Sequence, residues 1–331
     1  MPELSRILHT LDSAAGQPAA LATLVRVDGS SYRRPGARLL LLPEDTRVGS
    51  ISGGCLEEDV MERARRVLAS GKPELALYDT TSENDLVWGV GLGCQGVVHI
   101  FIERLPTVRP LWIKVLKENL QTRRDTELAI VHSGLVGLGT TLATELPAGV
   151  SFPAVFRQTI TAPPALVIFG AGDDARPLVR LAKEVGWHVT VVDSRSAYAT
   201  TDRFPEADAI TVALATEAAQ SLTANGSGFA VIMTHRYAED LQLLRQLLPH
   251  PLAYLGLLGP RKRAERLLAE LHKEGFAPDE TMLARMHSPI GLDLGGNTPE
   301  TVALAIMAEM QCRLTARTPI HLRDRATPIH G

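Results

Sequence analysis

The sequence predicts an α/β protein in which a mixed α+β N-terminal domain precedes a parallel-sheet domain. First, a continuous apolar strand at residues 165–169 begins an alternation of strands and helices, a pattern typical of a parallel sheet covered on both faces. Second, adjacent prolines at residues 161–164 favour extended backbone and form a candidate linker. Third, 331 residues fit two domains of roughly 100–200 residues each. We therefore expect domains at residues 1–160 and 165–315, followed by a loose tail at 316–331.

Composition narrows the classes of partner. A net charge of -3 with 45% hydrophobic residues describes an ordinary globular chain without the basic surface that nucleic acid requires, so anion binding must be local. No apolar run approaches the ~18 residues of a membrane span, and the N-terminal residues lack a secretory pattern, so we expect a cytoplasmic protein. The three cysteines, at 55, 94 and 312, are too scattered to predict a disulfide framework or a structural zinc site.

The N-terminal domain begins with an amphipathic helix at residues 3–14, whose leucines recur at helical spacing. A buried strand at 19–27 and a hairpin of 38–42 with 47–51 follow, and then a helix that ends near Ser70. Four further elements are expected in this domain: strands at 74–79, 97–102 and 127–132, and a helix at 112–121.

A glycine turn joins the hairpin to the helix. Gly53 and Gly54 precede Cys55, which we place in the first turn of that helix. Backbone N–H groups without partners and the helix dipole favour a thiolate there, and such a position lowers the pKa of a cysteine. The alternative is a small buried cysteine packed beside the glycines. Cys94 is also framed by glycines, so the two thiols could face one pocket.

A loop at residues 28–37 combines turn-forming residues with Arg33 and Arg34. Two guanidinium groups beside flexible backbone could clamp a phosphate or a carboxylate. The alternative is a solvated basic loop.

The C-terminal domain opens with a Gly-x-Gly-x-x-Ala fingerprint between a strand and a helix, typical of a Rossmann-like dinucleotide domain. Gly170 would make the tight turn, Gly172 would allow close backbone approach, and Ala175 would allow the helix to pack on the strand. Asp193, at the end of the next strand, suits a ribose hydroxyl. A nucleotide is therefore a possible ligand, although the acidic pair at residues 173–174 would repel a diphosphate at the helix N-terminus.

Two further candidates follow later strands of the same sheet. His235 and Arg261 both lie just past strand ends, at the edge where ligands bind in such sheets. The alternatives are a hydrogen-bonded strand-end histidine and a solvated basic turn.

Taken together, several stretches resemble the XdhC/CoxI-type xanthine dehydrogenase accessory protein family. These stretches also occur in the family's order: Gly29-Ser-Ser, Arg34-Pro-Gly-Ala37, Gly49-Ser-Ile-Ser-Gly-Gly-Cys-Leu-Glu57, Gly91-Leu-Gly-Cys-Gln-Gly96, the Rossmann fingerprint, Thr234-His235, Leu255-Gly-Leu-Leu-Gly259, Pro289-Ile-Gly-Leu-Asp293 and Thr298-Pro-Glu300.

The resemblance implies a cofactor-binding chaperone more than a turnover enzyme. Such a protein binds the molybdenum cofactor, as molybdopterin or its dinucleotide form, supports its sulfuration by a cysteine desulfurase, and inserts it into a molybdenum hydroxylase apoenzyme. Molybdenum could accept a soft thiolate from Cys55 or Cys94, with Glu57 as a proton acceptor. A homodimer is also implied.

Two other functions stay open. One is an NAD(P)-dependent oxidoreductase that uses the Rossmann-like domain, with His235 or Cys55 as acid or nucleophile. The other is a scaffold without catalytic activity that docks the desulfurase and the target enzyme.

Overall fold

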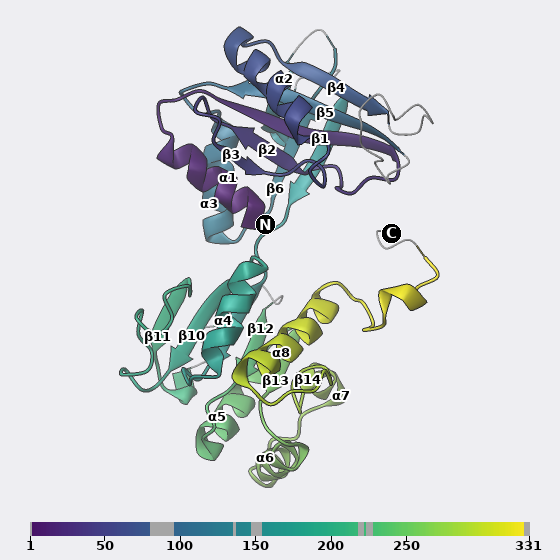
Figure 1. Ribbon diagram of the computed structural model, residues 1–331. Helices are drawn as coiled ribbons and strands as arrows, with labels where there is room; N and C mark the ends of the chain where they lie inside the picture. The colour runs from purple at the N-terminus through teal and green to yellow at the C-terminus, as the bar shows by residue number, and fades with distance from the viewer. Residues whose placement is uncertain are drawn as a thin grey trace. The chain divides into compact units, whose positions relative to one another are not determined.

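A computed structural model describes residues 2–79, 96–134, 137–146, 154–217, 222 and 228–327. The chain forms two compact units, Met1–Ala162 and Pro163–Gly331, which divide beside the prolines at residues 163 and 164 (Figure 1). Within the described ranges, no helix is long and apolar enough to cross a membrane.

The first unit is built on a five-stranded antiparallel sheet in the order β3-β2-β1-β5-β4. A smaller antiparallel sheet has the order β7-β6-β8. The elements of this unit, in chain order, are α1 (Pro2–Ser13), β1 (Ala19–Gly29), β2 (Arg38–Leu41), β3 (Arg47–Gly49), α2 (Glu57–Ser70), β4 (Glu74–Asp79), β5 (Gly96–Leu105), α3 (Leu111–Thr122), β6 (Thr126–Val131), β7 (Gly139–Leu142), the short 3-10 turn η2 (Ala143–Glu145) and β8 (Val155–Ile160).

Strand β1 is the centre of this unit because both of its faces are buried. Successive strand residues point to opposite faces, so Leu21 and Val25 join one core with α1 and α3, while Ala22 and Leu24 join the other with α2. This two-sided burial explains the unbroken apolar run in the sequence.

The hairpin strand expected at residues 47–51 ends two residues earlier, at Gly49. The N–H groups of Ile51 and Ser52 donate to the carboxylate of Glu57 instead of extending the strand. As a result, α2 begins at Glu57 with Leu56 as its N-cap residue. Cys55 therefore lies before the helix, and the prediction that it belongs to the first helical turn was wrong.

The second unit contains the predicted parallel sheet, with six strands in the order β11-β10-β9-β12-β13-β14. The strand order reverses between β9 and β12, as in a Rossmann fold. The elements are β9 (Ala165–Phe169), α4 (Ala175–Glu184), β10 (His188–Asp193), β11 (Ala209–Val212), β12 (Phe229–Ile232), α5 (Tyr237–Leu247), β13 (Tyr254–Leu257), α6 (Arg261–Lys273), α7 (Glu280–Leu283), β14 (Met286–His287), α8 (Pro299–Leu314) and the 3-10 turn η4 (Leu322–Asp324).

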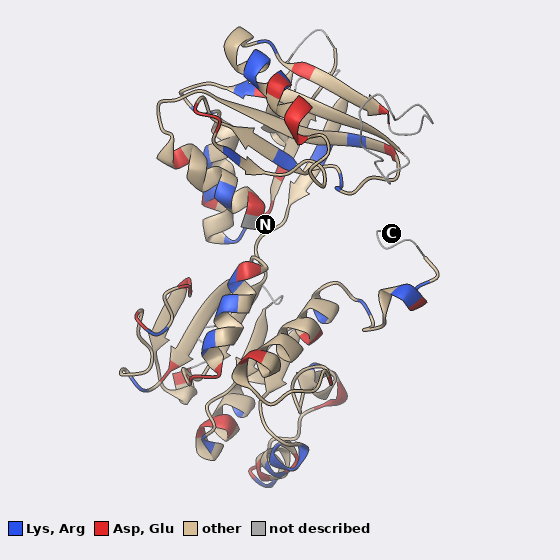
Figure 2. Ribbon diagram, viewed as in Figure 1, with Lys and Arg blue, Asp and Glu red and all other residues tan. Residues whose placement is uncertain are grey.

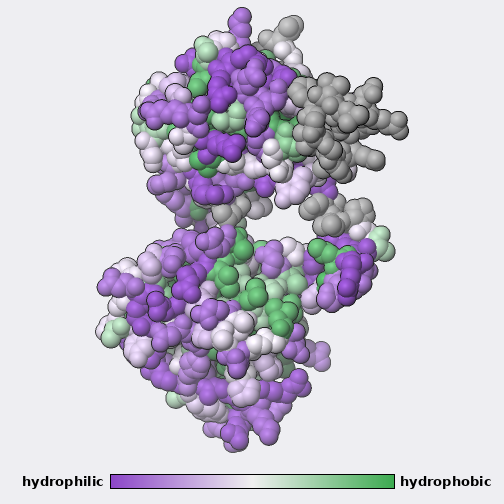
Figure 3. Space-filling view, viewed as in Figure 1, coloured by the Kyte–Doolittle hydropathy of each residue, from purple (hydrophilic) through white to green (hydrophobic). Residues whose placement is uncertain are grey.

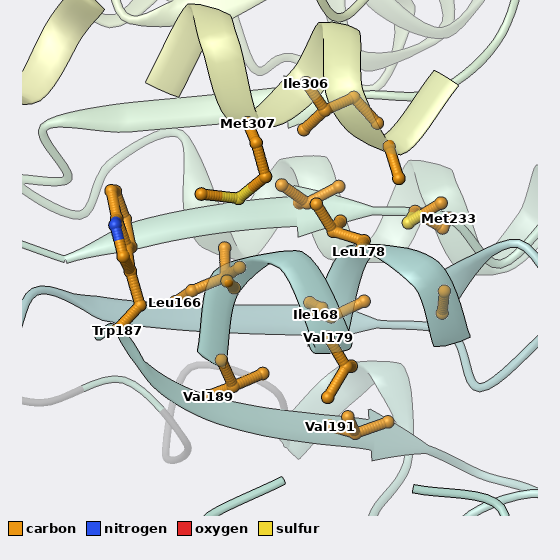
Figure 4. Close-up of a cluster of buried hydrophobic side chains, with 14 of the residues drawn as sticks. Leu166, Ile168, Leu178, Val179, Trp187, Val189, Val191, Met233, Ile306 and Met307 are labelled. Carbon is orange, nitrogen blue, oxygen red and sulfur yellow. The ribbon is translucent and has the colours of Figure 1, made fainter. Parts of the chain in front are cut away.

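Helices cover both faces of this sheet. Strand side chains such as Leu166 and Ile168 meet Leu178 of α4 and Met307 of α8 in one core, as Figure 4 shows. The alternate strand residues, such as Val167, pack with α5 and α6 on the opposite face. The predicted Rossmann-like architecture is confirmed.

Candidate functional site

The turn between β3 and α2 is held together by a buried glutamate. The carboxylate of Glu57 accepts hydrogen bonds from the hydroxyl of Ser50 at 2.9 Å and from the N–H groups of Ile51 at 3.3 Å and Ser52 at 2.9 Å. The hydroxyl of Ser52 donates to the other oxygen of the same carboxylate. Glu57 thus connects the first turn of α2 to the loop in front of it.

Burial acts to raise the pKa of Glu57, but the hydrogen bonds from Ser52 and Ser50 favour the charged form more strongly and hold the pKa below its usual value. Glu57 is therefore a carboxylate at neutral pH. Its oxygens already accept four hydrogen bonds, so its part in this turn is both structural and electrostatic.

The thiol of Cys55 is exposed at the outer side of this turn. Its Sγ donates to the hydroxyl oxygen of Ser52 at 3.6 Å, and that oxygen also accepts the N–H groups of Gly54 at 3.2 Å and Leu56 at 3.1 Å. Because Ser52 itself donates to Glu57, the thiol connects with the carboxylate through one hydroxyl. The alternative of a buried cysteine is therefore wrong for Cys55.

The two glycines of the turn have different surroundings. Gly54 has a φ of +115°, a left-handed conformation that favours glycine, and open space lies where a Cβ would be. At Gly53, a Cβ would lie 3.6 Å from the ring of Tyr32. The loop that carries Arg33 and Arg34 therefore passes beside the Cys55 turn.

Arg33 already has an anionic partner in its own unit. Its guanidinium lies 2.7 and 2.8 Å from the two carboxylate oxygens of Glu3 in α1. Arg34 is exposed, and its carbonyl accepts the N–H of Ala37 within the loop.

Cys94 lies outside the described residues, so the structure does not place it. In the part of the chain that the structure does describe, no group of three or more His, Cys, Asp or Glu residues could hold a metal ion.

In the second unit, the fingerprint residues build the turn after β9. Gly170 has a φ of +115°, and a Cβ there would lie 2.5 Å from the carbonyl oxygen of Met233, so only glycine fits. At Gly172, a Cβ would lie 2.8 Å from the carboxylate of Asp174. Ala175 is fully buried at the start of α4.

The carboxylate of Asp193, at the end of β10, is occupied by its own chain. It accepts the N–H of Ala171 at 2.7 Å and the N–H of Arg195 at 2.8 Å, and it pairs with the guanidinium of Arg195. Burial opposes ionisation, but these contacts outweigh it and lower the pKa of Asp193 to about 2. The hollow beside it measures only about 10 Å³, far below the ~300–1,000 Å³ of typical ligand pockets.

The phosphate end of the fingerprint is also paired internally. Asp173 forms an ion pair with Arg203 at 2.9 Å, and the carboxylate of Asp174 lies 2.6 Å from Nε2 of His235. Both carboxylates stand at the N-terminus of α4, where a diphosphate would need open N–H groups. His235 thus bonds to an acidic residue of the fingerprint loop.

Arg261 is the first residue of α6 and is exposed, with no ion pair to any other described residue. Its neighbour Arg263 instead pairs with the buried carboxylate of Asp240 at 2.6 Å. Figure 2 shows charges of both signs along α6. In this basic turn, Arg263 therefore has a structural role, whereas Arg261 is exposed.

Each of the two units matches a protein-family model that is named for XdhC. Residues 166–310 match the XdhC Rossmann domain, and residues 13–79 match the XdhC and CoxI family. A Bacillus subtilis protein that is named a probable xanthine dehydrogenase subunit is 33% identical over 314 residues, which cover 89% of this chain and 92% of that protein. The chain belongs to the XdhC and CoxI family. The resemblance seen in the sequence is thereby confirmed.

Three further proteins are similar to this chain. A molybdenum cofactor insertion chaperone of Escherichia coli, PaoD, is 24% identical over 89% of this chain and 83% of its own length. An uncharacterized E. coli protein, YqeB, is 26% identical, but this chain spans only 43% of it. The crystal structure of a xanthine dehydrogenase from Bacillus halodurans superimposes with a TM-score of 0.78 at 29% identity, covering 98% of this chain and 97% of that one.

In this XdhC-family chain, Ser50 and Ser52 are functional candidates that the sequence reasoning missed. Both hydroxyls donate to Glu57, and Ser52 also accepts from Cys55. A serine three residues before the cysteine and five before the glutamate was visible in the sequence, but spacing alone does not show that one carboxylate binds both ends of a turn.

Proposed function

We propose that this protein binds the molybdenum cofactor as cargo, supports its sulfuration by a partner cysteine desulfurase, and delivers it to a molybdenum hydroxylase apoenzyme. The observation that carries the proposal is the exposed thiol of Cys55, which is hydrogen-bonded through Ser52 to the carboxylate of Glu57. Family membership and the printed name of the relative PaoD, an insertion chaperone, support the same role.

The turn suits a carrier because it can hold a soft metal and release it. Thiolates are preferred ligands of soft metal centres, and the molybdenum cofactor presents its metal already bound by sulfur. Binding of the Cys55 sulfur to the metal would release the thiol proton to water at the exposed turn, because hydrogen bonds already hold Glu57 in its charged form. Protonation of the sulfur would restore the thiol when the cargo leaves, so binding would consume no reductant.

Cys94 is part of the same proposal as a second thiolate ligand. Its glycine-framed position in the sequence, Gly91-Leu-Gly-Cys-Gln-Gly96, supports a role beside Cys55. The choice between the two thiols, or the use of both, is decided by single and double substitutions.

The contacts within the Rossmann unit do not favour the alternative function of an oxidoreductase. A nicotinamide dinucleotide needs the Asp193 carboxylate for its ribose, but this carboxylate bonds within the chain. It also needs open N–H groups at α4, where the carboxylates of Asp173 and Asp174 would repel its diphosphate. We therefore propose that this unit supports cargo handling or partner binding instead of hydride transfer.

The decisive experiment is purification from cells that also produce a molybdenum hydroxylase, with molybdenum and pterin measured together. Wild type should carry both, and acid oxidation should release a fluorescent pterin. Cys55→Ala and Cys94→Ala should lose cofactor and fail to activate the hydroxylase, whereas Cys312→Ala in α8 should behave like wild type. If both variants hold cofactor and activate the enzyme as wild type does, thiol ligation is wrong.

The same protein distinguishes the two alternative functions. Saturable NADH binding without pterin would favour the oxidoreductase. A protein that binds neither pterin nor NADH would favour the scaffold.

We also propose that the protein is a homodimer and uses α8 for this contact. Leu304 and Leu314 of this helix are 53% and 42% exposed, and Figure 3 shows apolar side chains at the surface over α8. Exposed apolar patches of this kind mark interaction sites. Light scattering should give a dimer for wild type and a monomer for Leu304→Lys, whereas a dimeric Leu304→Lys protein would contradict the use of this surface.

A further inference from the structure

A hollow in the first unit lies between α1 and β3 and was not expected from the sequence. It measures about 650 Å³ and is open to solvent. Its charged and polar lining comes from α1, through Glu3, Arg6 and His9, and from the segment of β3, through Arg47 and Ser50. This volume is ample for a small anionic ligand.

The packing of α1 explains why these side chains face outward. Ile7, Leu8 and Leu11 are buried in the core, so the helix is anchored by one face. Arg6 and His9 are three residues apart and therefore neighbours along another face of the helix. Figure 2 shows both charge signs along α1.

A glycine lets the helix approach β3 closely. Gly49 has a φ of +96°, and a Cβ there would lie 2.2 Å from the carbonyl oxygen of Arg38 and 3.3 Å from Cδ1 of Ile7. The carbonyl of Arg38 and the side chain of Ile7 occupy the space beside Gly49, so α1 and the end of β3 pack closely at this point. This packing fixes one wall of the hollow.

The charge inside the hollow is positive. The carboxylate of Glu3 is neutralised by the ion pair with Arg33. Arg6 and Arg47 are exposed and form no ion pair with any residue that the structure describes. Two guanidinium groups beside a histidine and a hydroxyl form a donor-rich site, and planar guanidinium forks match phosphate oxygens well.

The hollow borders the turn that carries Cys55. Ser50 belongs to its lining, and the hydroxyl of the same residue donates to Glu57 at 2.9 Å. A ligand in the hollow therefore contacts the segment that positions the thiol.

We propose that this hollow is a phosphate-binding site in which Arg6 and Arg47 hold a phosphate monoester. On the proposed function, that phosphate is the one carried by the pterin of the cargo, while the metal end is held at the Cys55 turn. The clamp expected from the sequence consists of Arg33 and Arg34. Because Arg33 neutralises Glu3, the site proposed here uses Arg6 and Arg47 instead.

The test is a calorimetric titration of the full-length chain with inorganic pyrophosphate. Wild type should bind, and the Arg6→Gln/Arg47→Gln double variant should bind at least about tenfold more weakly, as expected for lost charge-assisted hydrogen bonds. The matched control is Arg124→Gln/Arg157→Gln, which removes two exposed arginines of the same unit outside the hollow and should bind like wild type. Circular dichroism and thermal unfolding should be alike for all three proteins.

Equal affinity of the two double variants, or a wild type that does not bind pyrophosphate, would overturn the site. The link to the cargo has its own readout, because Arg6→Gln/Arg47→Gln should also copurify with less molybdenum and pterin. Full cargo in that variant would overturn the link. If pyrophosphate binding depends on the two arginines but wild type never carries molybdenum or pterin, the phosphate site stands and the proposed function fails.

Discussion

The carboxylate of Glu57 accepts both the backbone N–H and the hydroxyl of Ser52, five residues earlier in the chain. This pair closes the turn in front of α2 and leaves the thiol of Cys55 on its outer side. Stability of the turn and presentation of the thiol therefore depend on one buried charge.

Glu57→Gln should destabilise the protein by about 1–3 kcal/mol, because the amide nitrogen cannot accept the hydrogen bonds that one carboxylate oxygen now accepts. Glu58→Gln, at the exposed neighbouring position, should change the free energy of unfolding by less than about 0.5 kcal/mol. Urea denaturation measures both. Equal stability of the two variants would show that the carboxylate does not hold the turn.

Gly54→Ala should cost about 1–2 kcal/mol in stability, because its φ of +115° is unfavourable for alanine although open space surrounds it. Gly16→Ala, with a φ of +83° and equally open surroundings, provides the matched control for backbone strain. Only Gly54→Ala should also reduce the molybdenum and pterin that copurify. Equal cofactor content in the two variants would argue against a role for this turn in cargo binding.

Gly170→Ala should reduce the stability by more than backbone strain alone would. The new Cβ would lie 2.5 Å from the carbonyl oxygen of Met233 and 2.9 Å from the nitrogen of Thr234. We expect a loss above about 3 kcal/mol, or failure to fold. Gly275→Ala, in the same unit with a φ of +85° and no neighbour within 4 Å, should lose only about 1 kcal/mol. Denaturation midpoints compare the two, and similar values would contradict the close approach of β9 and β12.

Asp193 should make the second unit sensitive to strong acid. Its pKa is about 2 in the folded protein against 3.8 ordinarily, so the unfolded chain binds the proton first as the pH falls. The stabilisation, about 2 kcal/mol, is present above pH 3.8 and is lost as the pH falls toward 2.

The check is the pH dependence of unfolding for Asp193→Asn and for Asp202→Asn, which replaces an exposed aspartate of the same unit. The stability difference between wild type and Asp193→Asn should shrink between pH 3.8 and about 2. A difference that stays constant over this range would show that Asp193 does not stabilise the unit through its charge.

The Rossmann unit was largely predictable because its signals are local. The apolar run at Ala165–Phe169, the glycine directly after it and the acid at the end of the next strand are adjacent in sequence to the elements they define. The bonding of Asp193 to Ala171 and Arg195 was not predictable, because it depends on how two turns approach each other in space.

The first unit was less predictable because its decisive contacts join distant residues. The ion pair between Arg33 and Glu3 spans 30 positions, and it gives one of the two arginines of the expected clamp an internal partner. Strands β7 and β8 were not predicted, because β7 is short and none of its residues is fully buried, while β8 has only its two ends buried. The sequence left open whether the Cys55 thiol is buried, and its exposed position before the helix follows from contacts of Glu57 that spacing does not show.

The carboxylate of Glu57 in α2 holds the preceding turn through hydrogen bonds. The position of the Cys55 thiol is therefore fixed relative to the helix. On the proposed function, an enzyme that delivers sulfur, or one that receives the cargo, would have to bring its own reactive centre to the exposed thiol. Such enzymes would then need a concave surface complementary to this turn. The geometry of the transfer would be set by this protein.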